Sequence, residues 1–164
     1  KYAKIGEGNI FYPNVIIESD SSSKLEIGNQ NIFFPSTFIQ SINSGIVSLA
    51  DKNQLEGGVS IKANREGSKI IIGSYGRYLN GVQLIGRCSL GDGAQVIGNI
   101  TVQDCILEDG ESYAYADADL RAGLLKGFGL ARGLVIKKGK VIDGCGSFDI
   151  SAIKNQSFFH PKKV

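Results

Sequence analysis

An apolar residue returns at every sixth position between residues 5 and 102, and the series resumes in phase after each interruption. A period of six fits neither the turn of an α-helix nor the simple alternation of a single strand. It is typical of short strands separated by turns, three of which complete one coil of a stacked structure. The positions of this series, called marker positions below, are Ile5, Phe11, Ile17, Ile27, Phe33, Ile39, Leu49, Leu55, Ile61, Ile72, Tyr78, Leu84, Leu90, Val96 and Val102.

A second set of positions supports the same phase. The fourth residue after each marker of the second strand is β-branched, as a buried position in a pleated strand favours: Val15, Thr37, Val59, Val82 and Ile100. The equivalent position after the first strand holds Asn9, Asn31 and Asn53, followed by Gly76 and Ala94. Stacked asparagines hydrogen-bond to one another along a stack. The pattern therefore predicts an all-β fold of about five coils.

The spacing of the early coils predicts where loops emerge. The segment from Ile5 recurs 22 residues later at Ile27, although three hexads need only 18. We expect the extra residues to form polar loops at one corner, at 19–24, 41–45 and 64–69. Such loops stack about 4.8 Å apart. Their polar side chains are either solvated turns or a ligand-binding surface, for which the candidate residues are Lys24, Asn43, Arg65 and Lys69.

After Val102 the hexad pattern stops, so we divide the chain into a coil domain at 1–110 and a C-terminal extension at 111–164. Asp117 is a good N-cap for a short helix that ends near Leu125. Residues 134–142 read as a hairpin that turns at Lys138-Gly139, and residues 144–164 as an extended tail. We expect this extension to cap the open end of the stack or to pack against a neighbouring subunit.

The extension also contains a glycine-rich run at 126–134. Lys126 and Arg132 lie within it, and backbone amides beside these two cations could hold an anion such as a phosphate. The run departs from the GxGxxG motif because Arg132 occupies the position of the third glycine. A capping loop with solvated charges is the alternative.

Composition narrows the function classes. The net charge of +2 is spread over both signs, so nucleic acid is not an expected partner. The chain has no apolar stretch long enough for a membrane span and no recognisable targeting segment, and we expect a cytoplasmic protein without a membrane partner. The cysteines, Cys88, Cys105 and Cys145, are odd in number and show no metal-binding spacing, which favours reduced thiols.

Several hexads begin with an aliphatic residue followed by glycine. They resemble those of the hexapeptide-repeat, acyltransferase-like superfamily: Ile5-Gly6, Ile27-Gly28, Ile72-Gly73 and Leu90-Gly91-Asp92-Gly93-Ala94. The resemblance implies a left-handed parallel β-helix, assembly as a homotrimer, and binding of a small-molecule ligand. It also implies acyl transfer from acetyl-CoA or another acyl-CoA co-substrate to a sugar or other small hydroxyl or amine acceptor, with no further cofactor required.

Acyltransferases of this superfamily use a histidine on a coil as general base, whereas His160 near the C-terminus is the only histidine of this chain. His160 is therefore the sole candidate catalytic residue. The carbonic-anhydrase branch needs three imidazoles for its metal, which this sequence lacks, so we expect neither that activity nor a metal site. The alternative to a transferase is a non-catalytic β-helix scaffold or binding module.

Overall fold

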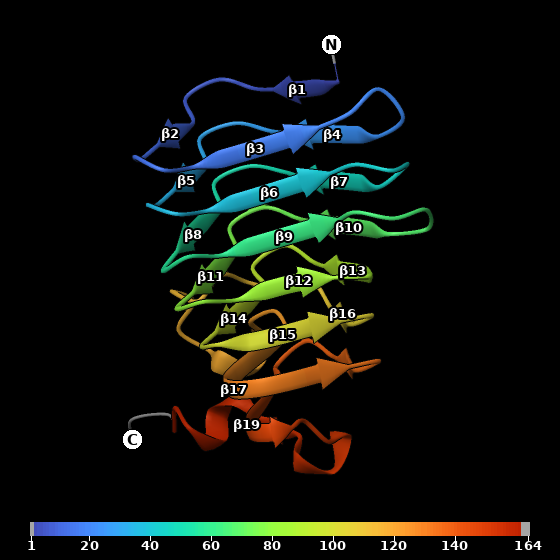
Figure 1. Ribbon diagram of the computed structural model, residues 1–164. Helices are drawn as coiled ribbons and strands as arrows, with labels where there is room; N and C mark the ends of the chain where they lie inside the picture. The colour runs from blue at the N-terminus through green and yellow to red at the C-terminus, as the bar shows by residue number, and fades with distance from the viewer. Residues whose placement is uncertain (1, 162–164) are drawn as a thin grey trace.

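The computed structural model describes residues 2–161, which form an almost entirely β structure of short strands stacked in parallel (Figure 1). The first face of the stack consists of β1 (Ala3–Ile5), β4 (Lys24–Ile27), β7 (Ile46–Leu49), β10 (Lys69–Ile72), β13 (Arg87–Leu90), β16 (Ile106–Leu107) and β18 (Val135–Ile136). The second face begins with β2 (Ile10–Phe11), β5 (Ile32–Phe33), β8 (Gln54–Glu56), β11 (Arg77–Leu79) and β14 (Gln95–Ile97). The third face begins with β3 (Ile16–Ser19), β6 (Phe38–Ser41), β9 (Ser60–Ala63), β12 (Gln83–Ile85) and β15 (Ile100–Gln103).

One long strand joins the second and third faces at the C-terminal end. The first residues of β17 (Leu124–Arg132) pair with β14, and its last residues pair with β15. The strand turns this corner at glycines, since Gly127 and Gly129 have φ values of 115° and 129°. A Cβ at Gly127 would lie 1.9 Å from the carbonyl oxygen of Gly144, so only glycine fits there. This arrangement of parallel strands in curled sheets is compatible with a parallel β-helix.

The register places each marker position on the corresponding marker of the next coil. Ile5 pairs with Ile27, Ile72 with Leu90, and Tyr78 with Val96. From Ile27 onward every marker is buried, which confirms the prediction from the hexad pattern. In the first coil, β1 to β3, Ile5 and Phe11 are 47% and 44% exposed because no described strand lies above them (Figure 1).

The predicted asparagine ladder is present inside the first corner. Asn31 donates through Nδ2 to Oδ1 of Asn9 over 3.1 Å, and Asn53 donates through Nδ2 to Oδ1 of Asn31 over 3.2 Å. Each Oδ1 also accepts the backbone N–H of the next asparagine in the ladder. At Gly76, where the ladder stops, a Cβ would lie 2.7 Å from the hydroxyl of Tyr78, which occupies the space of a further side chain.

Two predicted elements of the C-terminal extension are wrong. Instead of a helix from Asp117 to Leu125, the chain forms a single 3₁₀ turn, η1 (Ala118–Leu120), and then β17. Asp117 does cap η1, because its carboxylate accepts the N–H of Asp119. The helix does not form because Leu124 and Leu125 pair with Gln95 and Val96 of β14, and Leu125 continues the buried column of Val96.

The hairpin at 134–142 is also absent. β18 pairs in parallel with β16, and β19 (Lys140–Ser147) pairs in parallel with β17, so both strands extend existing sheets instead of pairing with each other. The sequence around Lys138-Gly139 is a turn between them. Strands of the 111–164 extension thus join the same sheets as those of residues 1–110.

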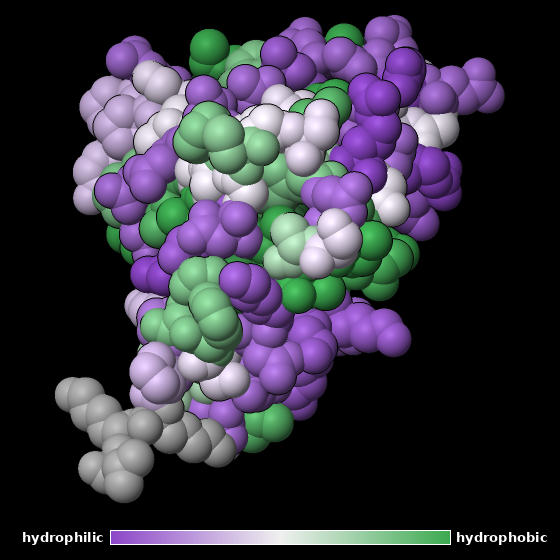
Figure 2. All heavy atoms as spheres, turned by 90° about the horizontal axis from the view of Figure 1, so that it is seen from below, coloured by the Kyte–Doolittle hydropathy of each residue, from purple (hydrophilic) through white to green (hydrophobic). Residues whose placement is uncertain are grey.

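The predicted tail packs against the last strands. It contains η2 (Ile150–Ala152), β20 (Lys154–Asn155), which is antiparallel to β19, and η3 (Gln156–Phe158). Phe148 of this segment is buried in the core cluster. Residues 162–164 of the predicted tail and residue 1 of the coil domain lie outside the described residues. Seen from below, the surface of this end mixes hydrophobic and hydrophilic side chains (Figure 2).

Candidate functional site

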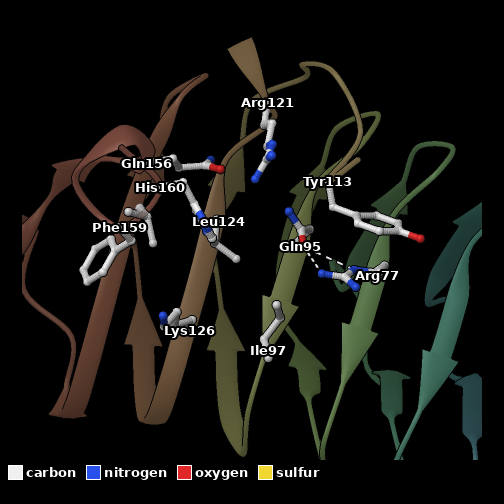
Figure 3. A pocket seen from close by; sticks show the side chains of 11 residues that line it. Arg77, Gln95, Ile97, Tyr113, Arg121, Leu124, Lys126, Gln156, Phe159 and His160 are labelled. Atoms are coloured by element: carbon white, nitrogen blue, oxygen red, sulfur yellow. Dashed lines mark hydrogen bonds between the residues drawn. The ribbon is translucent and has the colours of Figure 1, made fainter. Parts of the chain in front are cut away.

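A pocket of about 390 Å³ lies on the outer side of the second face, where the C-terminal segments fold over the strands. Small-molecule sites span roughly 300–1,000 Å³. Strands β11, β14, β17 and β19 form its floor, and the segments around Tyr113 and Phe159 form its walls (Figure 3). Below we call it the arginine pocket; it is lined by Arg77, Gln95, Ile97, Tyr113, Arg121, Leu124, Lys126, Val141, Gln156, Phe159 and His160.

The parallel register assembles the floor of the arginine pocket. Arg77 pairs with Gln95, Gln95 with Leu124, and Leu124 with Val141. Neighbouring strands are about 4.8 Å apart, so outward side chains at one register position form a continuous row. One hexad position thus contributes a charge, an amide and two apolar groups to one surface.

The guanidinium of Arg77 is held in place from two sides. Its Nε and Nη2 donate to Oε1 of Gln95 over 3.3 and 2.9 Å, and it stacks on the ring of Tyr113 at 3.7 Å from the ring centre. Gln95 is itself only 3% exposed. Because its partners are an amide and an aromatic ring, the positive charge of Arg77 is not neutralised.

Arg121 enters the pocket from the turn after η1. Its Nε and Nη2 donate to the carbonyl oxygen of Tyr115 over 2.8 and 2.6 Å. Among residues 2–161, neither Arg77 nor Arg121 forms an ion pair. Two fixed guanidinium groups without a carboxylate partner favour an anionic ligand.

Lys126 lies on the other side of the pocket and is partly neutralised. Its Nζ is 3.6 Å from a carboxylate oxygen of Asp143 and 4.8 Å from the ring centre of Phe159. His160 follows Phe159 at the rim and is exposed. Its backbone N–H donates to the carbonyl oxygen of Gln156 over 3.2 Å. Lys126 and His160, which the sequence singled out for separate reasons, therefore line one cavity.

Gln156 fixes the C-terminal wall of the pocket. Its Nε2 donates to the carbonyl oxygens of Ala122 and Lys140 over 2.6 and 3.2 Å, and the residue is only 1% exposed. Its Oε1 has no hydrogen-bond partner among the described residues. This oxygen is itself buried, so it is an unsatisfied acceptor within the wall of the pocket.

The corner loops hold the other predicted ligand-binding residues, far from the arginine pocket in the fold. Lys24 forms an ion pair with Glu26 at 3.4 Å, and Nδ2 of Asn43 donates to the carbonyl oxygen of Asn64. Arg65 is exposed in the turn before β10, and Lys69 begins that strand beside a shallow hollow that also includes Arg87.

Hydrogen bonds between successive corner loops explain much of their polar composition. The carboxylate of Asp20 accepts the backbone N–H of Asn43 and the hydroxyls of Ser23 and Ser22, and these bonds lower the pKa of Asp20 to about 2. Ser22 in turn accepts the backbone N–H of Ser44. Polar side chains here connect one loop to the next.

The glycine-rich run does not form an anion loop. It is the strand β17, paired with β14, β15 and β19, and its glycines lie at the corner. The N–H of Gly129 donates to the carbonyl oxygen of Asn99. Arg132 lies beyond this corner on the third face, where its Nε donates to Oε1 of Gln103 over 3.3 Å.

Residues 2–161 give little support for a reactive cysteine or a metal site. Cys88 and Cys105 are buried free thiols, and burial raises the pKa of Cys88 to about 11 and also raises the pKa of Cys105. The exposed Cys145 is also free. No group of three or more histidine, cysteine or acidic side chains in this part of the chain is arranged to hold a metal ion.

Five residues that line the arginine pocket were not predicted as site residues from the sequence: Arg77, Gln95, Tyr113, Arg121 and Gln156. A signal for the first two exists in the residue that precedes each second-strand marker. This residue changes from apolar to polar along the chain: Ile10, Ile32, Gln54, Arg77 and Gln95. The other three come from irregular segments, whose position no periodicity predicts.

Comparison with known proteins finds no family model, no curated protein and no solved structure that matches this chain. Within the described residues, none of the helices has the length and apolar character needed to cross a bilayer.

Proposed function

We propose that this chain is a transferase-like protein of the hexapeptide-repeat type, a left-handed parallel β-helix of about five coils. In this proposal it assembles as a homotrimer in the cytoplasm and transfers an acyl group from acyl-CoA to the hydroxyl or amine of a small acceptor. The parallel stack and the resemblance of its hexads support the class.

The observation that carries the proposal is the arginine pocket, in which His160 lies opposite two arginines that form no ion pair within residues 2–161. Arg77 and Arg121 bind an anionic group of the acceptor and so orient it. His160 lies across the pocket from Arg77 (Figure 3), and in this proposal it faces the reacting hydroxyl or amine.

In the reaction, His160 accepts the proton of the acceptor as its oxygen or nitrogen forms a bond to the acyl carbon. The bond between that carbon and the CoA sulfur breaks, and the departing thiolate takes the proton from the His160 imidazolium, which restores the neutral base. Imidazole suits this role because it titrates near neutral pH.

A thiol-release assay tests the proposal. The full chain is incubated with acetyl-CoA and a panel of anionic amines and alcohols, and free CoA is measured. General-base catalysis is typically worth about 10² to 10⁴ in rate, so we expect His160→Ala to lose at least about 100-fold while its melting curve stays unchanged. Arg132→Gln, a cation outside the pocket, is the matched control and should retain full activity.

One observation favours a second candidate, a non-catalytic binding module. The imidazole of His160 is exposed and makes no hydrogen bond with the described residues, whereas a general base is usually oriented by a partner. This candidate would be selected if the chain binds a ligand without releasing thiol and if His160→Ala binds that ligand with the same affinity.

A further inference from the structure

The arginine pocket separates charge from apolar surface. Figure 3 shows Arg77, Arg121 and Tyr113 on one side, Phe159 and His160 on the other, and Leu124 and Ile97 between them. The only carboxylate paired with a cation of the pocket is Asp143, on Lys126, among residues 2–161. The uncompensated positive charge therefore lies at the Tyr113 end.

The two arginines leave similar groups free for a ligand. Each uses Nε and Nη2 on one protein oxygen, that of Gln95 for Arg77 and that of Tyr115 for Arg121. The Nη1 group of each has no acceptor within residues 2–161. Two such donors, fixed by their other contacts, suit the oxygens of one carboxylate or phosphate group.

The rest of the pocket is unsuited to a compact, hydrated ion. Its floor between the two sides is lined by Ile97, Leu124 and Val141, and apolar atoms make up the larger part of the pocket lining. Phe159 closes the far side. A volume of about 390 Å³ is much larger than an acetate or inorganic phosphate ion fills.

We infer that the arginine pocket binds a small amphipathic organic anion. Its carboxylate or phosphate head lies between Arg77 and Arg121, and its apolar body covers Leu124 and reaches Phe159. This names the substrate class of the proposed transferase and rests on that proposal for the role of the pocket, but the binding itself needs neither acyl-CoA nor His160.

Calorimetric titration of the full chain, without acyl-CoA, tests the inference with matched ligands. Each methylene moved from water to an apolar surface contributes about 0.8 kcal/mol when fully buried. Hexanoate should therefore bind at least about tenfold more tightly than acetate, and hexyl phosphate at least about tenfold more tightly than inorganic phosphate. 1-Hexanol, which has the same apolar body without charge, should not bind measurably. The tighter of hexanoate and hexyl phosphate identifies the preferred head group.

Variants locate the two halves of the ligand. Arg121→Gln and Arg77→Gln should each weaken hexanoate binding at least about tenfold, since each removes a charge-assisted hydrogen bond. Phe159→Ala should weaken hexanoate but not acetate. Arg132→Gln is the control for loss of one surface charge, and its affinity should equal that of the unmodified chain. Melting curves identify any variant that does not fold. Arg121→Lys replaces an Arg121→Gln variant that does not fold, and its expected loss of affinity for hexanoate is smaller.

Equal affinity for hexanoate and acetate would overturn the inference, as would equal binding of hexanoate and 1-hexanol. So would an Arg132→Gln loss as large as that of Arg121→Gln. If hexanoate binds but no anionic amine or alcohol of the panel gives thiol release, the inference stands and the proposed catalysis is removed, so the two fail separately.

Discussion

The two ends of the stack continue the same inward-facing column but differ in what covers it. At the N-terminal end, Ile5 and Phe11 occupy marker positions and are 47% and 44% exposed. At the C-terminal end, the equivalent Leu107 and Leu125 are buried beneath β18, β19 and the segments that follow. Those covering segments also supply Gln156 and His160 to the pocket, and the segment between η1 and β17 supplies Arg121.

The difference separates the scaffold from the site. The regular coils use hydrogen bonds and apolar burial to set the spacing of strands, and their corner loops bond mainly to one another. The arginine pocket exists only where irregular segments fold back on a regular face. The candidate site therefore depends on additions to the repeat as well as on the repeat itself.

The largest expected effect is that of a charge placed in the column. Val59 is 0% exposed, and Val59→Asp buries an unpaired carboxylate at a cost of about 4 kcal/mol or more, which unfolds the protein. Val15 occupies the same position in the first coil but is only half-buried, so Val15→Asp should cost less than about 2 kcal/mol. Urea unfolding measures both. Equal losses would contradict the difference between the ends.

The asparagine ladder tests the same difference between the two ends through smaller losses of stability. Asn31→Ala removes the acceptor of the backbone N–H of Asn53 in a fully buried site, for an expected loss of about 1–3 kcal/mol. Asn9→Ala makes the same change at the partly exposed end of the ladder, where water replaces the lost bonds, and should cost about 1 kcal/mol or less. The difference in free energy of unfolding between the two variants is the measurement, and a reversed order would be inconsistent with the ladder as described.

Tyr78→Phe should have the smallest effect. The hydroxyl of Tyr78 is fully buried, which raises its pKa, and it has no hydrogen-bond partner among the described residues. Since removing an unpaired buried polar group loses no bond, the variant should lie within about 1 kcal/mol of the unmodified chain or be slightly more stable. A clear loss of stability in thermal unfolding would indicate that the hydroxyl has a bonded partner.

The sequence predicted the coils well because their signal repeats. Markers such as Phe33 and Leu55 are buried as expected, since each must fill the same column in every coil. The prediction failed at Leu124 and Leu125, whose spacing fits a short helix as well as a strand. Pairing with β14, a contact distant in sequence, decided between the two.

Only part of the candidate site was predictable. Lys126 and His160 were predicted as site residues from the chemistry of their side chains, and the structure places both in the arginine pocket. Arg121 and Gln156 depend on the path of irregular segments, which carry no period. Arg77 occupies an outward hexad position, and the hexad pattern of apolar residues predicts only the inward positions.

The short sequence distance between stacked partners has a kinetic consequence. Paired strands lie about one coil apart, as with Ala3 and Leu25 or Lys69 and Arg87, so no contact of the stack closes a very long loop. Such a chain folds by nucleation and growth, each completed coil serving as the template for the next. Amide hydrogen exchange should then show protection that is highest in the middle coils and falls toward β1 and β2, whose marker side chains Ile5 and Phe11 are exposed.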